Sequence, residues 1–398
     1  MVKLVYRSFV VLTLAVLSNL GVAQTSNGAA PSQLCGNFNV DEDTAPLRKE
    51  LLALLRDKKY PALDDTLNDR HARMLKGEFT DQTLVRLTNF VDGADPALEP
   101  LLNEWVRTSQ GGFMALLVRG KYHSATAWKK RGSEFADKTS NDQLDAMAEA
   151  FKKAAADLLE SRQKQPRSVL PYPDLMHIAS AVGQRGEISD ILMRANEVAP
   201  QNYVARRMAV VRFSPKWGGS FEDMDKVLLQ SKTSQLPAID QRKLEYSVLM
   251  EKASHYKIVE KRPIEALPYY TQAAKLCDSY AAWGEVSGIQ YEREDWPAVE
   301  AATNQYMRLR PDTAWGFNRR AWALEKQGRV KDAIVDYERS AELGNDYAQN
   351  KMGYFYLTGN AVTKDLVKAK ALFEKANAQG NKNAKTQLEY MARLPALK

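Results

Sequence analysis

The chain has 398 residues, of which 44% are hydrophobic and 26% charged, and 56 Lys and Arg against 49 Asp and Glu give a formal net charge of +7. These values are typical of a soluble globular protein and exclude a disordered chain, a collagen-like fibre and a multi-span membrane protein. Two cysteines are too few for a disulfide-stapled miniprotein or a multi-zinc module, and the small charge excess does not indicate nucleic-acid binding.

The first residues have the three-part layout of a secretory signal peptide. Lys3 and Arg7 provide a positive start, residues 9–17 are almost entirely apolar, and Gly21 and Ala23 supply the small residues of a cleavage site. The apolar run is too short for a membrane-spanning helix, which needs ~20 residues. We therefore predict residues 1–23 to be a signal peptide, and the protein to be periplasmic or secreted after cleavage near Ala23, with no transmembrane segment remaining. The alternative is an uncleaved N-terminal anchor.

Export would place the two cysteines, Cys35 and Cys277, in an oxidising compartment, where an even pair can form a disulfide. The alternative is two unpaired thiols, with Cys277 a small buried hydrophobe near the end of a helix. Residues 24–45 are rich in small and polar residues and are expected to form a flexible segment that leads into the folded part.

From Pro46 onward, apolar residues recur at spacings of three and four, as on one face of a helix. Leu47, Leu51 and Leu55 are the first such set. Glycine and proline interrupt the pattern at short intervals and leave segments of roughly 10 to 20 residues, the usual helix length. No stretch shows sustained alternation with β-branched residues. The sequence therefore predicts an all-α fold, with residues 46–235 as an N-terminal helical domain.

Three segments further along share a small-aromatic-small spacing at intervals of 32 and 35 residues. They are Ala266, Tyr270 and Ala273; Ala298, Ala302 and Tyr306; and Ala333, Tyr337 and Ala341. The pattern resembles the tetratricopeptide repeat, whose helix pairs need small residues where they cross and an aromatic ring beside them. Gly328 fits the turn, whereas Gln305 stands where a small residue is expected. We expect degenerate repeats of this type over residues 236–345.

Residues 346–392 resemble the related SEL-like repeat. Ala348 and Ala384 lie 36 residues apart, the period of that family, and Gly359 falls where the loop between two helices needs a positive φ. The residues that would fill the helix crossing are Tyr356, Ala369, Phe373 and Ala376. The expected architecture is an α-solenoid of helix-turn-helix repeats that continues from the N-terminal helical domain.

Three phrases mark the N-terminal half: AWKKRG at 127–132, EVAPQNYVARRM at 197–208 and SPKWGGSFEDM at 214–224. In this order they resemble a bacterial family known only as a domain of unknown function. The resemblance implies a helical, repeat-like module and supplies no activity, substrate or catalytic residue. One departure is Lys216, where the family more often has Arg.

The segment around Trp217 is compatible with two interpretations. Gly218 and Gly219 permit a tight turn and Ser220 can cap the following helix, so that Trp217 packs under a structural corner. Alternatively, Trp217 lines a ligand groove together with Lys130 and Arg131. The structural corner is the favoured interpretation.

No motif in the sequence identifies catalytic chemistry. Phosphate-binding glycine loops and the Gly-x-Ser-x-Gly elbow are absent. The four histidines stand far apart and have no metal-ligand neighbour of the HExxH kind; they are His71, His123, His177 and His255. We therefore assign no catalytic residue, cofactor or metal ligand, and we predict neither enzymatic activity nor a nucleic-acid partner. The oligomeric state stays open.

A helical-repeat solenoid has an extended surface that suits peptides and proteins. We therefore predict an exported scaffold that binds a protein or peptide in the cell envelope. The first-helix residues proposed for that surface are Asn318, Trp322, Asn350 and Tyr354. For Trp322 and Tyr354 the alternative role is core packing.

Two other functions compete with the scaffold hypothesis. The first is a cell-envelope enzyme that uses the repeats as a targeting arm, which would need a deep polar pocket near His123, Arg131 and Trp217. The second is a purely structural envelope component, which would self-associate and bind nothing in a groove.

Overall fold

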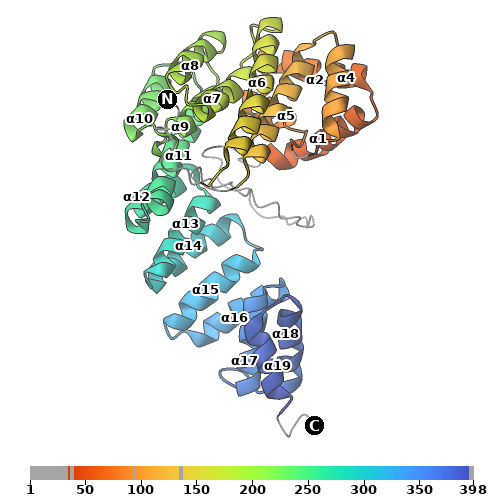
Figure 1. Ribbon diagram of the computed structural model, residues 1–398. Coiled ribbons are helices and arrows are strands. Elements are labelled where there is room, and N and C mark those ends of the chain that lie inside the picture. The colour runs from red at the N-terminus through yellow and green to blue at the C-terminus, as the bar shows by residue number, and fades with distance from the viewer. Residues whose placement is uncertain (1–34, 36–39, 94, 134–137, 394–398) are drawn as a thin grey trace. The chain divides into compact units, whose positions relative to one another are not determined.

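The structure, a computed structural model, describes residues 35, 40–93, 95–133 and 138–393 (Figure 1). These residues form nineteen α-helices and contain no strand, which confirms the predicted all-α fold. They divide into two compact units, one up to His255 and one from Tyr256. The predicted signal peptide, and residues 24–34 and 36–39 of the expected flexible segment, lie outside the described residues. Within the described residues, no helix has the length and apolar character needed to cross a membrane.

The first unit contains eleven α-helices. They are α1 (Val40–Arg56), α2 (Tyr60–Leu75), α3 (Asp81–Leu87), α4 (Leu98–Thr108), α5 (Phe113–Arg131), α6 (Asn141–Lys164), α7 (Pro171–Ala181), α8 (Gly186–Val198), α9 (Val204–Arg212), α10 (Phe221–Lys232) and α11 (Ala238–Ser254). The first of these begins at Val40 and includes Pro46, although the apolar pattern suggested a start at Pro46. Proline has a helical φ but lacks the backbone N–H and crowds the preceding turn, so Pro46 weakens the first two turns of α1 without ending the helix there.

Helices α5 and α6 form a long antiparallel pair at the centre of the first unit. The helix α6 starts at Ser140, whose hydroxyl accepts from the Gln143 backbone N–H while the Gln143 side chain accepts from the Ser140 N–H, a capping box. Between the two helices, the Arg119 guanidinium donates to both carboxylate oxygens of Asp157 at 2.7 and 2.8 Å. Burial of apolar side chains such as Phe151 supplies the main stabilisation of this pair.

The Trp-Gly-Gly-Ser segment forms the predicted corner between α9 and α10. A short 3-10 turn, Pro215–Trp217, ends at Gly218 with a φ of 82°. A Cβ on Gly218 would collide with the Arg185 guanidinium, and one on Gly219 would collide with the Phe213 carbonyl oxygen. Ser220 then caps α10 by accepting from the Asp223 backbone N–H at 3.1 Å. Two glycines are needed here because the chain turns against other backbone and side-chain atoms.

The second unit begins with a π-helical turn, His255–Val259 next to the unit boundary, and continues as a row of helices (Figure 1). They are α12 (Pro263–Cys277), α13 (Tyr280–Glu292), α14 (Trp296–Leu309), α15 (Ala314–Lys326), α16 (Val330–Glu342), α17 (Asp346–Thr358), α18 (Leu366–Ala378) and α19 (Lys382–Met391). Each helix packs mainly against the helices directly before and after it. These stacked hairpins are the α-solenoid that the repeats predicted.

The SEL-like repeat folds as its sequence pattern predicts. Ala348, Ala369, Phe373, Ala376 and Ala384 are all fully buried. A Cβ on Gly353 would lie 2.7 Å from the ring of Phe373, so α17 and α18 can approach this closely only because this position has no side chain. Gly359 ends α17 in the left-handed region with a φ of 74°, as expected for the turn.

The second tetratricopeptide unit has a different register from the one that we predicted. Its buried residues on α14 are Val299, Ala302, Thr303 and Met307, whereas Ala298 is only partly buried. The mismatch at Gln305 disappears in this register, because Gln305 is exposed. Thr303 occupies a core position because its hydroxyl pairs with that of Ser287 at 2.9 Å.

Candidate functional site

Two first helices of the repeat hairpins, α15 and α17, carry the residues that were predicted to bind a partner. On α15, Trp315, Asn318, Arg319 and Trp322 follow the spacing of one helical face. We call this set, together with Tyr291 of α13 and Asn350 and Tyr354 of α17, the first-helix face. The pairs Asn318–Trp322 and Asn350–Tyr354 occupy equivalent positions 32 residues apart.

Several polar atoms of the first helices are buried and have no hydrogen-bond partner among the described residues. They are the side-chain oxygens of Asn318 and Asn350 and the indole nitrogens of Trp283 and Trp322. Leaving such a group unpaired costs about 1–3 kcal/mol, which a ligand that supplies the missing partner would recover. An unpaired asparagine oxygen thus recurs at the same position of two successive repeats in the described part of the chain.

The two aromatic residues of this prediction have different surroundings. Trp322 is partly buried and makes an edge contact with the ring of Tyr291, with centroids 5.9 Å apart, so it contributes to packing. Tyr354 is 46% exposed. Of the two residues, Tyr354 is the more exposed.

Arg319 belongs to the first-helix face but was not predicted from the sequence. Its guanidinium lies 4.2 Å from the ring centroid of Tyr291 and 5.3 Å from that of Trp315. It forms no ion pair with any carboxylate in the described part of the chain, and burial lowers its pKa. The spacing of Trp315 and Arg319, four residues apart, was the signal available in the sequence.

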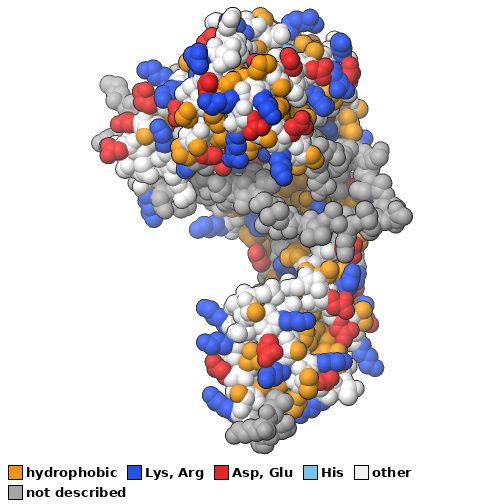
Figure 2. Space-filling view, turned by 90° about the vertical axis from the view of Figure 1, so that its right-hand side faces the viewer, with side chains coloured by type: hydrophobic (Ala, Val, Ile, Leu, Met, Phe, Trp, Pro, Cys, Tyr) orange, Lys and Arg blue, Asp and Glu red, His pale blue; other side chains and the backbone are white. Residues whose placement is uncertain are grey.

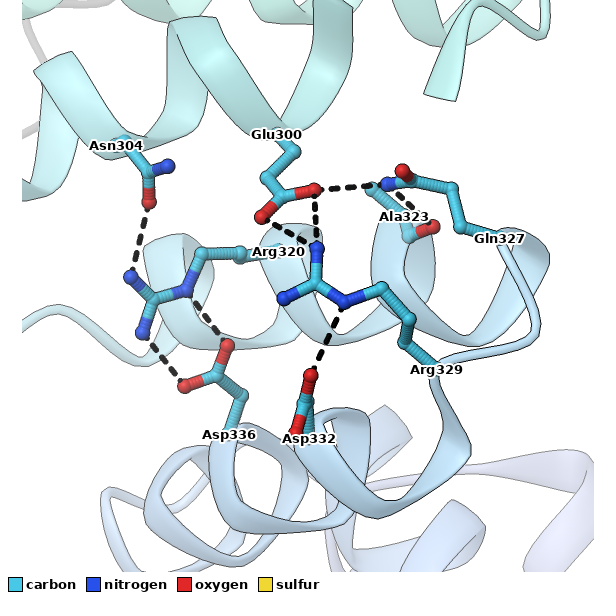
Figure 3. A network of polar contacts seen from close by, with 8 residues as sticks. All are labelled: Glu300, Asn304, Arg320, Ala323, Gln327, Arg329, Asp332 and Asp336. Carbon is cyan, nitrogen blue, oxygen red and sulfur yellow. Dashed lines mark hydrogen bonds and ion pairs between the residues drawn. The ribbon is translucent and has the colours of Figure 1, made fainter. Parts of the chain in front are cut away.

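Arg320, the next residue, lies on another side of α15, and its guanidinium is hydrogen-bonded to side chains of both neighbouring helices (Figure 3). It donates to both carboxylate oxygens of Asp336 on α16 at 2.7 and 2.8 Å and to Asn304 on α14 at 2.9 Å. Arg329 similarly bridges Glu300 and Asp332, at 3.0 Å each. These charges satisfy one another across three helices, so we interpret the network as structural even though it borders a cavity of about 310 Å³.

In the first unit, two of the three residues predicted to line a groove, Arg131 and Trp217, contact the ring of Trp128. The ring of Trp217 meets Trp128 edge-on with centroids 6.0 Å apart, and the Arg131 guanidinium lies 5.9 Å from the Trp128 ring. His177 stacks on Trp128 at 5.3 Å. Lys130 is exposed at the end of α5 and is not part of this cluster.

The buried groups around Trp128 are held in their neutral form or stacked on rings. Burial, reinforced by the positive charge of Arg212, lowers the pKa of His177 well below its usual value. Burial also lowers the pKa of Arg212 to about 10, and this guanidinium stacks 4.3 Å from the Trp217 ring. These contacts agree with the structural-corner interpretation of Trp217.

His123 lies away from this cluster, on the side of α5 that faces α6. It is buried, its Nε2 is 4.0 Å from the Asp157 carboxylate, and burial lowers its pKa. The Asp157 carboxylate is already engaged by Arg119. Three cavities among the described residues, of about 790, 310 and 330 Å³, are lined by residues other than His123, Arg131 and Trp217. The described residues also contain no cluster of His, Cys, Asp and Glu that could hold a metal ion.

The net positive charge is not gathered on the face of the molecule shown in Figure 2. There, Lys and Arg side chains are interspersed with Asp, Glu and apolar side chains on both units. Nucleic-acid binding proteins usually present a continuous basic surface, which this view does not contain.

Comparison with protein families gave matches to two segments of the chain. Residues 47–207 match the family described as a domain of unknown function (DUF4034), and residues 346–381 match the Sel1 repeat. Both resemblances predicted from the sequence are thereby confirmed. A comparison with curated proteins gave no match.

The chain is similar to several solved helical-repeat structures. A Sel1 repeat protein from Oxalobacter formigenes has 18% identity and a TM-score of 0.41, over 77% of this chain and 84% of that one. A protective antigen with an SLR fold from uropathogenic Escherichia coli has 13% identity and a TM-score of 0.34, over 90% and 91%. A tetratricopeptide repeat protein from Parabacteroides merdae has 16% identity and a TM-score of 0.28, over 63% and 95%.

Proposed function

We propose that the chain is an exported bacterial scaffold that binds a protein or peptide segment on the first-helix face of its second unit. The observation that carries this proposal is that Asn318 of α15 and Asn350 of α17 occupy equivalent positions. Each has a buried amide oxygen with no hydrogen-bond partner among the described residues. An extended peptide offers a backbone N–H at regular intervals, and an asparagine amide can accept from one and donate from its own nitrogen.

The aromatic and cationic residues of the same face support a peptide ligand. Tyr354 is exposed beside Asn350, and Arg319 is a guanidinium without a carboxylate partner in the described part of the chain. Aromatic residues and arginine are the side chains that contribute most binding free energy at protein interfaces. The second unit therefore offers polar, aromatic and charged contacts along consecutive helices.

The location in the cell envelope rests on the signal-peptide pattern of residues 1–23 and on the cysteines. In the structure, Cys35 and Cys277 are both in disulfide form. They are the two cysteines of the sequence, so we propose that they bond to each other, which requires an oxidising compartment.

Site-specific photo-crosslinking in a producing bacterium tests the binding function. A photoreactive phenylalanine at Tyr354, on the first-helix face, should form an adduct of defined mass. The same group at Val367, which is 76% exposed on the second helix α18, should not.

The adduct at position 354 should be lost when Asn318→Ala and Asn350→Ala are combined, and retained with Asn377→Ala, an exposed asparagine of α18. Equal adducts at 354 and 367, or an adduct that survives the double substitution, would contradict the assignment of this face. Cell fractionation and N-terminal sequencing of the purified chain test export, which fails if the protein retains Met1 and remains in the cytoplasm.

A further inference from the structure

A cavity of about 790 Å³ lies in the first unit between α8, α9 and α10. Leu192, Arg206 and Val227 line it and are almost completely buried, with exposed fractions of 5%, 3% and 3%. Asp190 and Glu197 of α8 line it and are exposed. Its most deeply buried lining side chains are thus two apolar groups and one guanidinium, its partly buried polar lining residues include Asn196 and Asp223, and its outer edge carries carboxylates.

Arg206 is a buried cation whose one carboxylate neighbour with a resolved electrostatic effect, Asp81, forms no direct ion pair with it among the described residues. Its Nη1 donates to the backbone carbonyl of Asn202 at 2.5 Å, and it forms no ion pair with a carboxylate of any described residue. Burial lowers its pKa. A guanidinium has five N–H donors, and a buried charge that lacks an ionic partner is costly. A carboxylate in the cavity would supply both the charge and a bidentate acceptor.

The other charges at the cavity restrict which anions fit. Lys226 is already paired with Glu222 and Asp223, at 3.0 and 3.6 Å. Asp190 and Glu197 form no ion pair within the described residues, so two negative charges remain near the opening. They repel a multiply charged anion such as phosphate and attract a cationic amine.

The cavity also accounts for sequence phrases that the proposed function leaves unused. Glu197, Pro200 and Arg206 belong to EVAPQNYVARRM, and Asp223 belongs to SPKWGGSFEDM. All four residues line the cavity. These phrases therefore bring together the residues of one concave site, although they lie on different helices.

We propose that this cavity binds a small zwitterion that carries one carboxylate and one amine, the class of amino acids and short peptides with free termini. Arg206 binds the carboxylate, Asp190 and Glu197 bind the ammonium group, and Leu192 and Val227 contact the apolar part. The volume lies within the range of about 300–1,000 Å³ that small-molecule sites occupy. This site is independent of the first-helix face and of the proposed scaffold function.

Isothermal titration calorimetry on the purified mature chain tests the proposal, with L-alanine and tri-L-alanine as probes. Saturable binding of at least one probe with a stoichiometry of one is expected. Blocking the carboxylate as an amide, or the amine by acetylation, should weaken binding about tenfold or more, the effect of losing a charged hydrogen bond.

Variants assign the two charges separately. Arg206→Gln should weaken binding of the free acid about tenfold or more, whereas Arg207→Gln, the exposed neighbour on α9, should have no effect. Because Arg206 is buried, its variant needs a thermal unfolding control. The combined variant Asp190→Asn and Glu197→Gln changes exposed side chains and should weaken binding of the free amine but not of the acetylated probe.

Three results would overturn the inference. They are the absence of saturable binding for both probes, equal affinity for the free acid and its amide, and tighter binding of inorganic phosphate than of either probe.

Discussion

Arg319 and Arg320 are adjacent residues of α15 with different roles. Arg320 is held by Asp336 and Asn304, and the Asp336 hydrogen bond raises its pKa. Arg319 rests on two aromatic rings without a carboxylate partner in the described residues. Sequence reasoning found the helix and the neighbouring Asn318 and Trp322 but could not separate the two arginines, because that depends on which residues α13, α14 and α16 bring to each side.

Substituting the two arginines should therefore affect different properties. Arg320→Met leaves the carboxylate of Asp336, which is 4% exposed, without its ionic partner and should lower the free energy of unfolding by about 1.5–3 kcal/mol. Arg319→Met should lower it by at most about 1 kcal/mol and should reduce the crosslink at position 354. Urea unfolding of both variants measures the two losses of stability. Equal losses would contradict a structural role for Arg320 that Arg319 does not share.

A second prediction concerns the buried histidines. Burial lowers the pKa of His71 to about 4 and lowers those of His123 and His177 below the usual value of about 6.5. Above about pH 6.5 these groups are neutral in both the folded and the unfolded state. As the pH falls below that value, the unfolded state binds protons that the folded state does not, so stability is lost towards the folded-state pKa.

We expect the free energy of unfolding to fall between pH 7 and pH 5, with each such histidine contributing up to about 1.4 kcal/mol per pH unit. His177→Phe, which keeps a ring against Trp128, should reduce the slope. Urea titrations of the two proteins across this range measure the difference. If the dependence of the unfolding free energy on pH were unchanged, His177 would not contribute to the loss of stability at low pH.

At the scale of helices and turns, the repeats of the second unit were predicted from small and aromatic residues at fixed spacings. The SEL-like repeat was predicted correctly because its small residues, such as Ala369 and Ala376, are required by the close crossing of two helices. The register of α14 was wrong by one residue because Ala298 and Val299 both fit an apolar pattern. In the structure Val299 is fully buried and Ala298 is not, and the contact between Ser287 and Thr303 belongs to the same register.

Gly353 and Gly288, both in first helices, allow a matched test of the close crossing of α17 and α18. Gly353→Ala places a methyl group 2.7 Å from the Phe373 ring and should lower the free energy of unfolding by about 1–3 kcal/mol. Gly288→Ala, on α13, meets no atom within 4 Å and should raise stability by up to about 1 kcal/mol through helix propensity. The changes in unfolding free energy are measured by chemical denaturation. If both variants changed the stability in the same direction, the close packing of α17 on α18 would be contradicted.

At the scale of the whole molecule, the sequence predicted an all-α chain with an N-terminal helical domain and C-terminal repeats. The structure adds the unit boundary after His255, next to the π-helical turn. The cavity around Arg206 could not be predicted, because its residues come from three helices that no periodicity places side by side. The phrases around it marked the right residues without indicating that they share one cavity.

The proposed bond between Cys35 and Cys277 would join residues that are far apart in the sequence. Non-reducing peptide mapping by mass spectrometry should recover one crosslinked peptide that contains both residues, and reduction should lower the thermal midpoint. Removing a native disulfide typically costs about 2–4 kcal/mol, so Cys35→Ser with Cys277→Ser should show a comparable loss. Alkylation of both thiols in the unreduced, freshly exported protein would contradict the bond.

Because each helix of the second unit packs mainly against its two sequence neighbours, the row of helices has no central layer that depends on its total length. A duplication or deletion of one complete hairpin would therefore leave the remaining interfaces intact. Gene duplication can thus lengthen or shorten the first-helix face in whole repeats, so that descendants of one ancestor fit partners of different length without a new fold.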